Sequence, residues 1–117
     1  MRFLWVALLA CSSVSGADVV MVADEIPAME TLARELKTRA GVNAGIVRQE
    51  AMPADLSRYR AVFVYIHGDI TPVAEHAFID YARAGGRLIL LHHTISSGKR
   101  KNKDWLPFLG VELPERP

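Results

Sequence analysis

Residues 85–105 read GGRLILLHHTISSGKRKNKDW and carry the strongest fold signal in the chain. Gly85 and Gly86 are residues of the kind that end helices, and the apolar run 88–91 that follows them fits a short buried strand. His92 and His93 come directly after this strand. The order of helix end, strand and polar loop predicts that a functional site lies at the end of this strand.

Apolar and amphipathic segments alternate through the rest of the chain. Strands are expected over residues 18–23, 44–48, 61–66 and 88–91. Helices are expected over residues 26–40 and 71–84, with a helical turn or short helix over 53–59 and a short helix capped by Asp104. This alternation predicts a single α/β domain with a parallel sheet and helices on both faces.

A flavodoxin-like strand order, 2-1-3-4, is the expected topology for such a sheet. No fifth strand is evident before the sequence ends in LPERP, so we expect four strands and a truncated domain. One edge of the sheet would then be open, and a second copy of the chain could pair with it.

The first 17 residues have the pattern of a bacterial export signal. Arg2 precedes an apolar run, and small residues end the segment at Ala17. Export with cleavage after Ala17 would leave a domain of residues 18–117. Alternatively, residues 8–11, LLAC, resemble a lipobox that would anchor the protein by lipid at Cys11. Leu9 is unusual at its lipobox position, which favours ordinary secretion.

Cysteine and charge content exclude several function classes. Cys11 is the only cysteine, so residues 18–117 contain no thiol for a disulfide, a thiolate metal site or a cysteine nucleophile. The same residues carry equal numbers of basic and acidic side chains, and this balance does not indicate a nucleic-acid partner. No apolar stretch predicts a transmembrane span in the mature domain.

The expected topology brings polar residues together beyond the carboxyl ends of the strands, where open α/β sheets bind ligands. Asp24, with Glu25 directly after it, would lie near His67 and Asp69, because the first and third strands are neighbours. His92 and His93 would lie one strand further on. These are the candidate site residues, with the carboxylates in substrate binding or orientation and the histidines in catalysis.

Histidines and carboxylates on one rim can bind a divalent metal or transfer protons near neutral pH. Adjacent strand residues point to opposite faces, so we expect one of His92 and His93 to be functional and the other structural. His76, within a helix, is expected to be a surface residue. The sequence does not decide whether a cofactor binds.

Two further features of residues 85–105 have alternative interpretations. The basic run 99–103 could attract an anionic substrate, but a solvated loop is the simpler expectation. Trp105 could stack on a sugar ring, but its helical spacing beside Leu106 and Phe108 favours a role in anchoring the short helix to the core. No phosphate-binding glycine loop, serine nucleophile elbow or HExxH zinc motif is present.

Residues 85–93, GGRLILLHH, together with residues 104–110, DWLPFLG, resemble the ThuA-like (trehalose utilisation) domain. In that family a strand ending in histidine precedes a tryptophan and an LG pair, and the resemblance covers residues 18–113. It implies a class I glutamine amidotransferase-like fold and a role in carbohydrate metabolism, often in secreted proteins. The family domain is about twice as long, so the chain is expected to be its N-terminal part.

The resemblance does not carry amidotransferase activity. In the amidotransferases a cysteine nucleophile follows this strand, whereas here the strand leads to His92. Two functions stay open. One is a hydrolase or isomerase that acts on a sugar derivative through the rim histidines, and the other is a non-catalytic sugar-binding or interaction module.

Overall fold

The computed structural model describes residue 14 and residues 16–114, which form one parallel sheet with helices on both faces. The strands are β1 (Val19–Ala23), β2 (Ala44–Val47), β3 (Ala61–Tyr65) and β4 (Leu88–Leu90). The helices are α2 (Ile26–Ala40), α3 (Pro72–Arg83) and α4 (Trp105–Leu109), and short 3-10 segments span Gln49–Ala51, His92–Thr94 and Ser97–Lys101. The strand order is β2-β1-β3-β4, all parallel. The predicted α/β class and strand order are confirmed.

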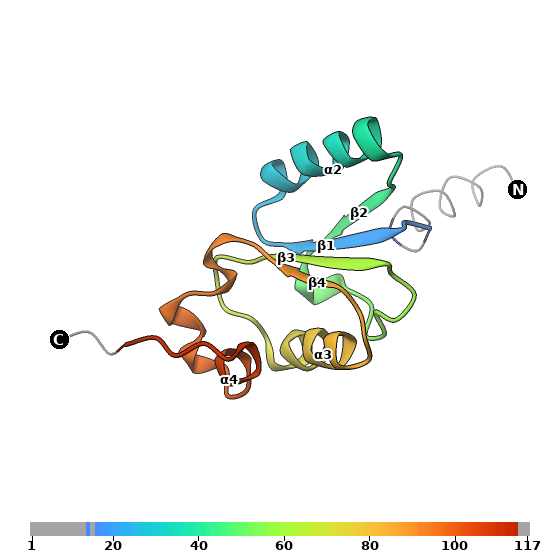
Figure 1. The fold of residues 1–117 in the computed structure, drawn as a ribbon. Coiled ribbons are helices and arrows are strands. Elements are labelled where there is room, and N and C mark those ends of the chain that lie inside the picture. Colours follow the sequence, from blue (N-terminus) through green and yellow to red (C-terminus); the bar gives the residue numbers. More distant parts are fainter. Residues whose placement is uncertain (1–13, 15, 115–117) are drawn as a thin grey trace, which may run out of the picture.

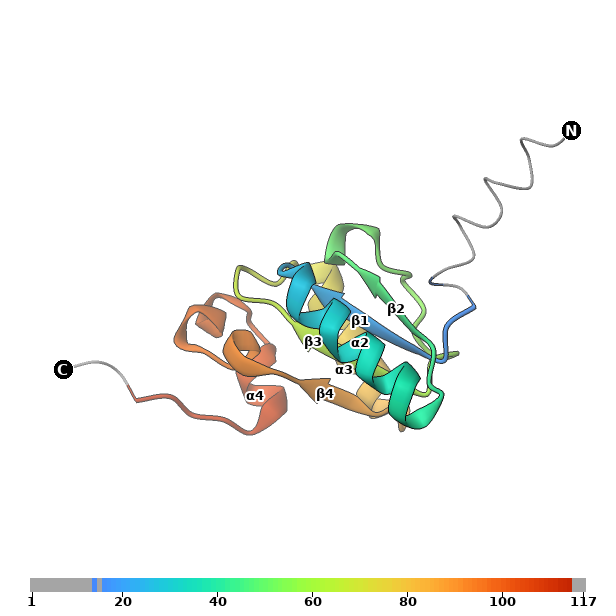
Figure 2. The same ribbon diagram turned by 90° about the horizontal axis from the view of Figure 1, so that it is seen from above.

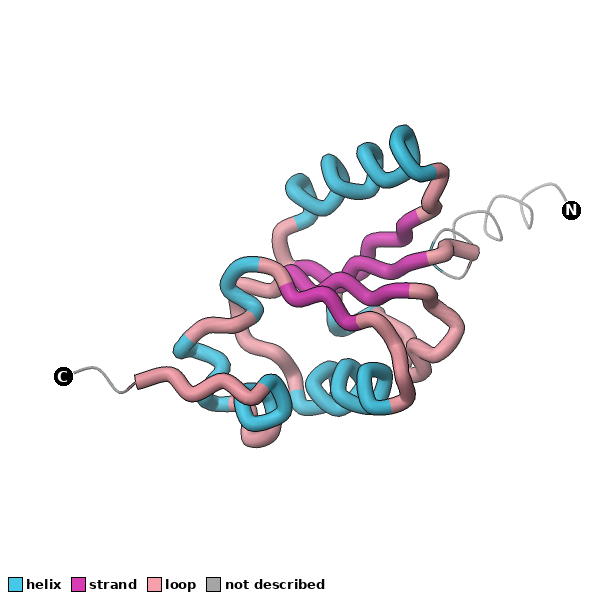
Figure 3. Tube along the Cα trace, in the orientation of Figure 1, coloured by secondary structure: helices cyan, strands magenta, loops and turns pink. Residues whose placement is uncertain are grey.

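The molecule has three layers. Helix α2 lies over one face of the sheet, whereas α3 and α4 lie on the opposite face (Figure 1). The same arrangement is seen from above in Figure 2, where α2 crosses in front of the strands and α3 lies behind them. Loops join the layers at both ends of the strands (Figure 3).

Side-chain alternation along the central strands divides the core into two parts. All five residues of β1 are buried, as a strand covered on both faces requires. Val20 and Val22 pack with Phe78 of α3. Met21 faces the other way and packs with Met29 of α2. The near-continuous apolar run in the sequence is therefore explained by two separate apolar layers.

The helix ends follow the expected local chemistry. Gly41 adopts a left-handed conformation with φ 66° and ends α2. The Thr71 hydroxyl accepts a hydrogen bond of 3.2 Å from the Ala74 N–H and begins α3. Gly41 thus ends α2 shortly before β2, and Thr71 begins α3 after the loop that follows β3.

Two local expectations are wrong. Residues 53–59 form turns rather than a helix, because the Asp55 carboxylate accepts the Ser57 N–H at 2.9 Å and stabilises a turn instead. Asp104 does not cap α4 with its side chain. Its backbone N–H instead donates to the Glu75 carboxylate at 3.1 Å, which ties the start of α4 to α3.

Residues 1–13 and 15 lie outside the described part of the chain, so the predicted export signal and the lipid anchor at Cys11 stay predictions. Val14 is described, and its carbonyl oxygen accepts a hydrogen bond of 3.2 Å from the Tyr59 hydroxyl. Within the described residues, every helix is too short or too polar to cross a bilayer.

Candidate functional site

Polar residues from three neighbouring strands gather at the carboxyl edge of the sheet. Asp24 directly follows β1, and His67 comes two residues after the end of β3. His92 and His93 come just after β4, in the 3-10 turn His92–Thr94. Since β1, β3 and β4 are adjacent, these residues lie together as the topology predicts.

The Asp24 carboxylate holds the backbone that carries His67. It accepts the N–H of His67 at 2.9 Å and the N–H of Gly68 at 2.8 Å. Its Oδ1 also lies 3.4 Å from Nδ1 of the His67 ring. Burial would raise the pKa of Asp24, but the N–H groups of Gly68 and His67 and the His67 ring outweigh it and lower that pKa below 3.8. Asp24 is therefore a carboxylate at neutral pH.

Three histidine rings form a cluster beside this carboxylate. The ring centroid of His67 lies 5.0 Å from that of His92 and 5.1 Å from that of His93. The His92 and His93 centroids are 3.8 Å apart. One ring nitrogen from each residue lies within 4.8 Å of the others. We call His67, His92 and His93 the histidine cluster.

An unusual backbone conformation lets both adjacent histidines join the cluster. The strand ends at Leu90, and His92 has a φ of 56°, in the left-handed region that side chains other than glycine rarely adopt. The alternation of strand side chains therefore stops before the histidine pair. Both His92 and His93 are exposed. Both rings are exposed and belong to the cluster, so the expected division into one functional and one structural histidine stays a prediction.

Neighbouring positive charge favours the neutral form of His93. The pKa of His93 is lowered below 6.5, first by the charge that His92 would carry, then by partial loss of solvent, by His67 and by Lys99. Glu25 acts weakly in the opposite direction. A neutral imidazole can accept a proton or bind a metal ion, so the arrangement suits both kinds of chemistry.

Tyr65 and Glu25 border the cluster; Glu25 was expected near His67, whereas Tyr65 was not predicted. The Tyr65 ring lies edge-on to His67 at 4.8 Å and stacks beside His92 at 6.1 Å. Glu25 Oε1 lies 3.7 Å from His67 Nδ1. Both could be found from their positions in the sequence, because Glu25 directly follows Asp24 and Tyr65 is the last residue of β3.

Lys99 overturns the expectation of a solvated basic loop. Its side chain is buried, with 1% of the residue exposed, and its ammonium donates to the carbonyl oxygens of Gly68 at 2.7 Å and His67 at 3.2 Å. Burial lowers the pKa of Lys99 below 10.5, an effect that Asp24 and Asp69 partly oppose. Lys101, by contrast, is exposed.

The remaining predicted residues lie away from the cluster. Trp105 is fully buried and donates its indole N–H to the Thr94 carbonyl oxygen at 3.0 Å. It anchors α4, and no face is free to stack on a sugar. The Asp69 carboxylate pairs with Lys101 at 3.2 Å and is 75% exposed. Neither residue is in the histidine cluster.

His76 belongs to a second group of donors, with Glu75 and Asp104. His76 Nε2 lies 3.8 Å from Asp104 Oδ2, and both side chains are at least half exposed. Glu75 is buried, and its carboxylate is used by the Asp104 N–H. An exposed contact between His76 and Asp104 and a structural hydrogen bond explain this group, in line with the predicted surface position of His76.

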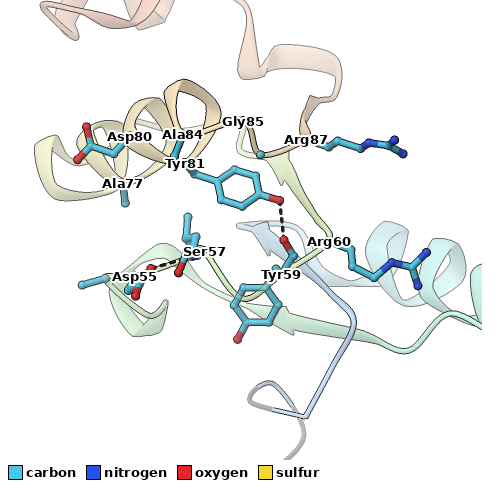
Figure 4. A pocket seen from close by; sticks show the side chains of 13 residues that line it. Asp55, Ser57, Tyr59, Arg60, Ala77, Asp80, Tyr81, Ala84, Gly85 and Arg87 are labelled. Carbon is cyan, nitrogen blue, oxygen red and sulfur yellow. Dashed lines mark hydrogen bonds between the residues drawn. The ribbon is translucent and has the colours of Figure 1, made fainter.

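A cavity of about 560 Å³ lies at the opposite edge of the sheet, against the residues that precede β3 and β4. Figure 4 shows Tyr81 donating its hydroxyl to the Tyr59 carbonyl oxygen, a bond of 2.8 Å, while Arg60 and Arg87 extend together in one direction. No histidine is among the described residues that line it. The cavity is lined by carboxylates such as Asp55 and Asp80 but brings no imidazole together with them, whereas the histidine cluster gathers three.

The strand order and the histidine cluster are the features on which the chain can be compared with known proteins. No protein family model, curated protein or solved structure matches the chain.

Proposed function

We propose that the protein is a ThuA-like domain linked to carbohydrate metabolism, whose histidine cluster binds a divalent metal ion and acts on a sugar derivative by hydrolysis or isomerisation. The observation that carries the proposal is the convergence of His67, His92 and His93 within 4.8 Å at the carboxyl edge of the sheet. The GGRLILLHH and DWLPFLG motifs and the four-stranded order support the family part of it.

The donor set fits a borderline-soft metal ion such as Zn²⁺. Three histidines with an open fourth position are a known catalytic zinc arrangement, in which the nitrogens lie about 3.3 Å apart. In the structure the three nitrogens lie within 4.8 Å of one another, a limit wider than that spacing. Because His92 and His93 are exposed, small side-chain rotations can close the difference. A bound zinc ion would polarise a substrate carbonyl or activate water.

Asp24 suits the role of orienting carboxylate. Metal-binding histidines usually direct their second ring nitrogen to a carboxylate or carbonyl oxygen. His67 Nδ1 faces Asp24 Oδ1 at 3.4 Å and Glu25 Oε1 at 3.7 Å, which leaves Nε2 for a ligand. In the absence of a metal, neutral His93 could serve as a general base.

Glutamine amidotransfer is excluded from the proposal on chemical grounds. That reaction needs a thiolate after the strand that corresponds to β4. Residues 18–117 contain no cysteine, and the left-handed position after β4 is occupied by His92. An imidazole there can bind a metal or move a proton, but it cannot form a thioester.

A Co²⁺ titration followed by absorption tests the metal site. The wild-type chain is expected to bind one equivalent, and His67→Ala, His92→Ala and His93→Ala are each expected to weaken binding about 10–100-fold. His76→Ala is the matched control, since His76 is exposed and outside the cluster. No saturable binding by the wild type, or an equal loss in His76→Ala, would contradict the metal site.

The alternative, a non-catalytic sugar-binding or interaction module, predicts saccharide binding that survives all three cluster substitutions. Trp105 has no exposed surface, so its replacement would act through stability alone. Calorimetry with trehalose and glucose as probes distinguishes this alternative from the enzyme proposed above. Binding that is unchanged in His67→Ala and His93→Ala favours the module.

We also propose that the protein is exported, with lipid anchoring at Cys11 as the alternative. The support is the sequence pattern of residues 1–17. Mass spectrometry of the N-terminus after expression in a bacterial host distinguishes the routes: secretion predicts a chain that begins at Asp18. Labelling with radioactive palmitate that is absent in Cys11→Ser would instead support the anchor.

A further inference from the structure

Lys99 is the one buried lysine in the described part of the chain. It lies in the 3-10 segment Ser97–Lys101, between exposed neighbours Gly98 and Arg100. Its ammonium reaches under the loop after β3 and donates to the carbonyl oxygens of His67 and Gly68. A buried ammonium is unfavourable unless its N–H groups are hydrogen-bonded, so this position is specifically arranged around the two carbonyls.

Asp24 holds the same two residues from the other side. Its carboxylate accepts the N–H groups of His67 and Gly68, whereas Lys99 donates to their carbonyl oxygens. All four polar backbone groups of the His67–Gly68 segment are therefore bound by two side chains of opposite charge. The segment lies beyond β3, so the sheet itself does not fix it.

We propose that Lys99 is a positioning residue, which together with Asp24 fixes the His67–Gly68 segment so that the His67 ring faces His92 and His93. The inference rests on the proposed function of the histidine cluster. It assigns no catalytic role to Lys99, because the buried ammonium is already bound to two carbonyl oxygens and has 1% of its residue surface exposed.

The charge on Lys99 is explained by the orientation of the His67–Gly68 segment and not by the filling of space. A methionine would fill a similar volume at this buried position without the cost of burying an ammonium. Charged donors also form directional hydrogen bonds that are stronger than neutral ones. Lys101, two residues along, pairs instead with the exposed Asp69 carboxylate and provides a matched lysine that does not donate to the His67 or Gly68 carbonyl oxygens.

The test compares Lys99→Met with Lys101→Met in the full chain. Co²⁺ affinity is expected to fall about tenfold or more in Lys99→Met, with a changed visible absorption spectrum, because His67 no longer has a fixed direction. Lys101→Met is expected to match the wild type within about twofold. Lys99→Arg, which keeps the charge and the donors, is expected to recover part of the affinity. Wild-type affinity and spectrum in folded Lys99→Met would overturn the inference.

Amide hydrogen exchange gives a second readout that does not need a metal. The His67 and Gly68 amides are expected to exchange at least about tenfold faster in Lys99→Met than in Lys101→Met, with the Val62 and Val64 amides unchanged. If the wild type binds no Co²⁺, the proposed metal site fails and exchange alone decides the role of Lys99. Equal exchange in both variants would then overturn it. Should Lys99→Met not fold, Lys99→Gln is measured and interpreted in the same way.

Discussion

The indole N–H of Trp105 donates a 3.0 Å hydrogen bond to the carbonyl oxygen of Thr94, the residue that directly follows the histidine pair. The Thr94 hydroxyl is also buried and accepts the Ile66 N–H at 3.2 Å. The same hydroxyl lies 2.7 Å from the Leu91 carbonyl oxygen and 3.0 Å from that of Val64. Thr94 thus connects the ends of β3 and β4 to α4, and it fixes the backbone on which His92 and His93 stand.

Replacing Thr94 by valine removes this hydroxyl without changing the shape of the side chain. The buried Ile66 N–H then lacks its acceptor, so Thr94→Val is expected to lower the free energy of unfolding by about 1–3 kcal/mol. Urea denaturation measures the change. Thr94→Ser, which keeps the hydroxyl, is the control and should lose only about 1 kcal/mol for the methyl group. A larger loss in serine than in valine would contradict this role.

Gly86 lies against the Tyr81 ring, and a β-carbon there would come within 2.5 Å of it. Gly86→Ala is therefore expected to displace the ring, weaken its hydroxyl bond to Tyr59 and destabilise the fold by about 1–3 kcal/mol. In a Tyr81→Leu background the cost should shrink, which a double-mutant cycle measures. Additive effects would disprove the clash. Gly98→Ala is the control, because its β-carbon would meet only Ser96 Oγ at 3.8 Å.

Asp24 should contribute stability that is lost in acid. Its pKa is lowered in the folded protein, so the unfolded chain takes up the proton first as the pH falls through 3.8. Asp24→Asn removes this dependence and is expected to cost about 1–3 kcal/mol at neutral pH. The difference from the wild type should narrow below about pH 4, as measured by urea unfolding across a pH series. A constant difference down to strong acid would argue against the hydrogen-bonded carboxylate.

His93 should titrate below 6.5, the ordinary histidine value, because a proton on it would be repelled by His92. An NMR titration of the His93 ring measures the midpoint. His92→Gln should raise this midpoint, because it removes the neighbouring charge that lowers the pKa of His93 most. The unfolded chain binds the proton more readily, so the contribution of His93 falls as the pH drops through 6.5. A midpoint unmoved in His92→Gln would show that the rings do not interact.

The sequence predicted the sheet and the residues at its carboxyl edge because both depend on local patterns. Apolar runs separated by amphipathic segments imply a parallel sheet, and the strand order then brings His67 beside Asp24. The conformation of His92 was not predictable, since a left-handed histidine leaves no mark on composition. The alternation of side chains along a strand therefore predicted that His92 and His93 point to opposite faces, whereas the structure brings their rings together.

Lys99 shows a second limit of sequence reasoning. A run of basic residues looks the same whether each ammonium is solvated or one of them is buried, and only tertiary contacts distinguish Lys99 from Lys101. Trp105 is the opposite case. Its position beside Leu106 and Phe108 already favoured the core over a sugar platform, and the structure buries it completely.

The position of β4 affects how firmly the histidine pair is held. β4 is the last strand in the order and is hydrogen-bonded to β3 alone among the described residues. A strand paired on one side opens locally at lower free energy than a central strand. A strand added at this edge, whether from further sequence or from a second copy of the chain, would slow that opening. Pairing at the β4 edge would therefore stiffen His92 and His93 without contacting either ring.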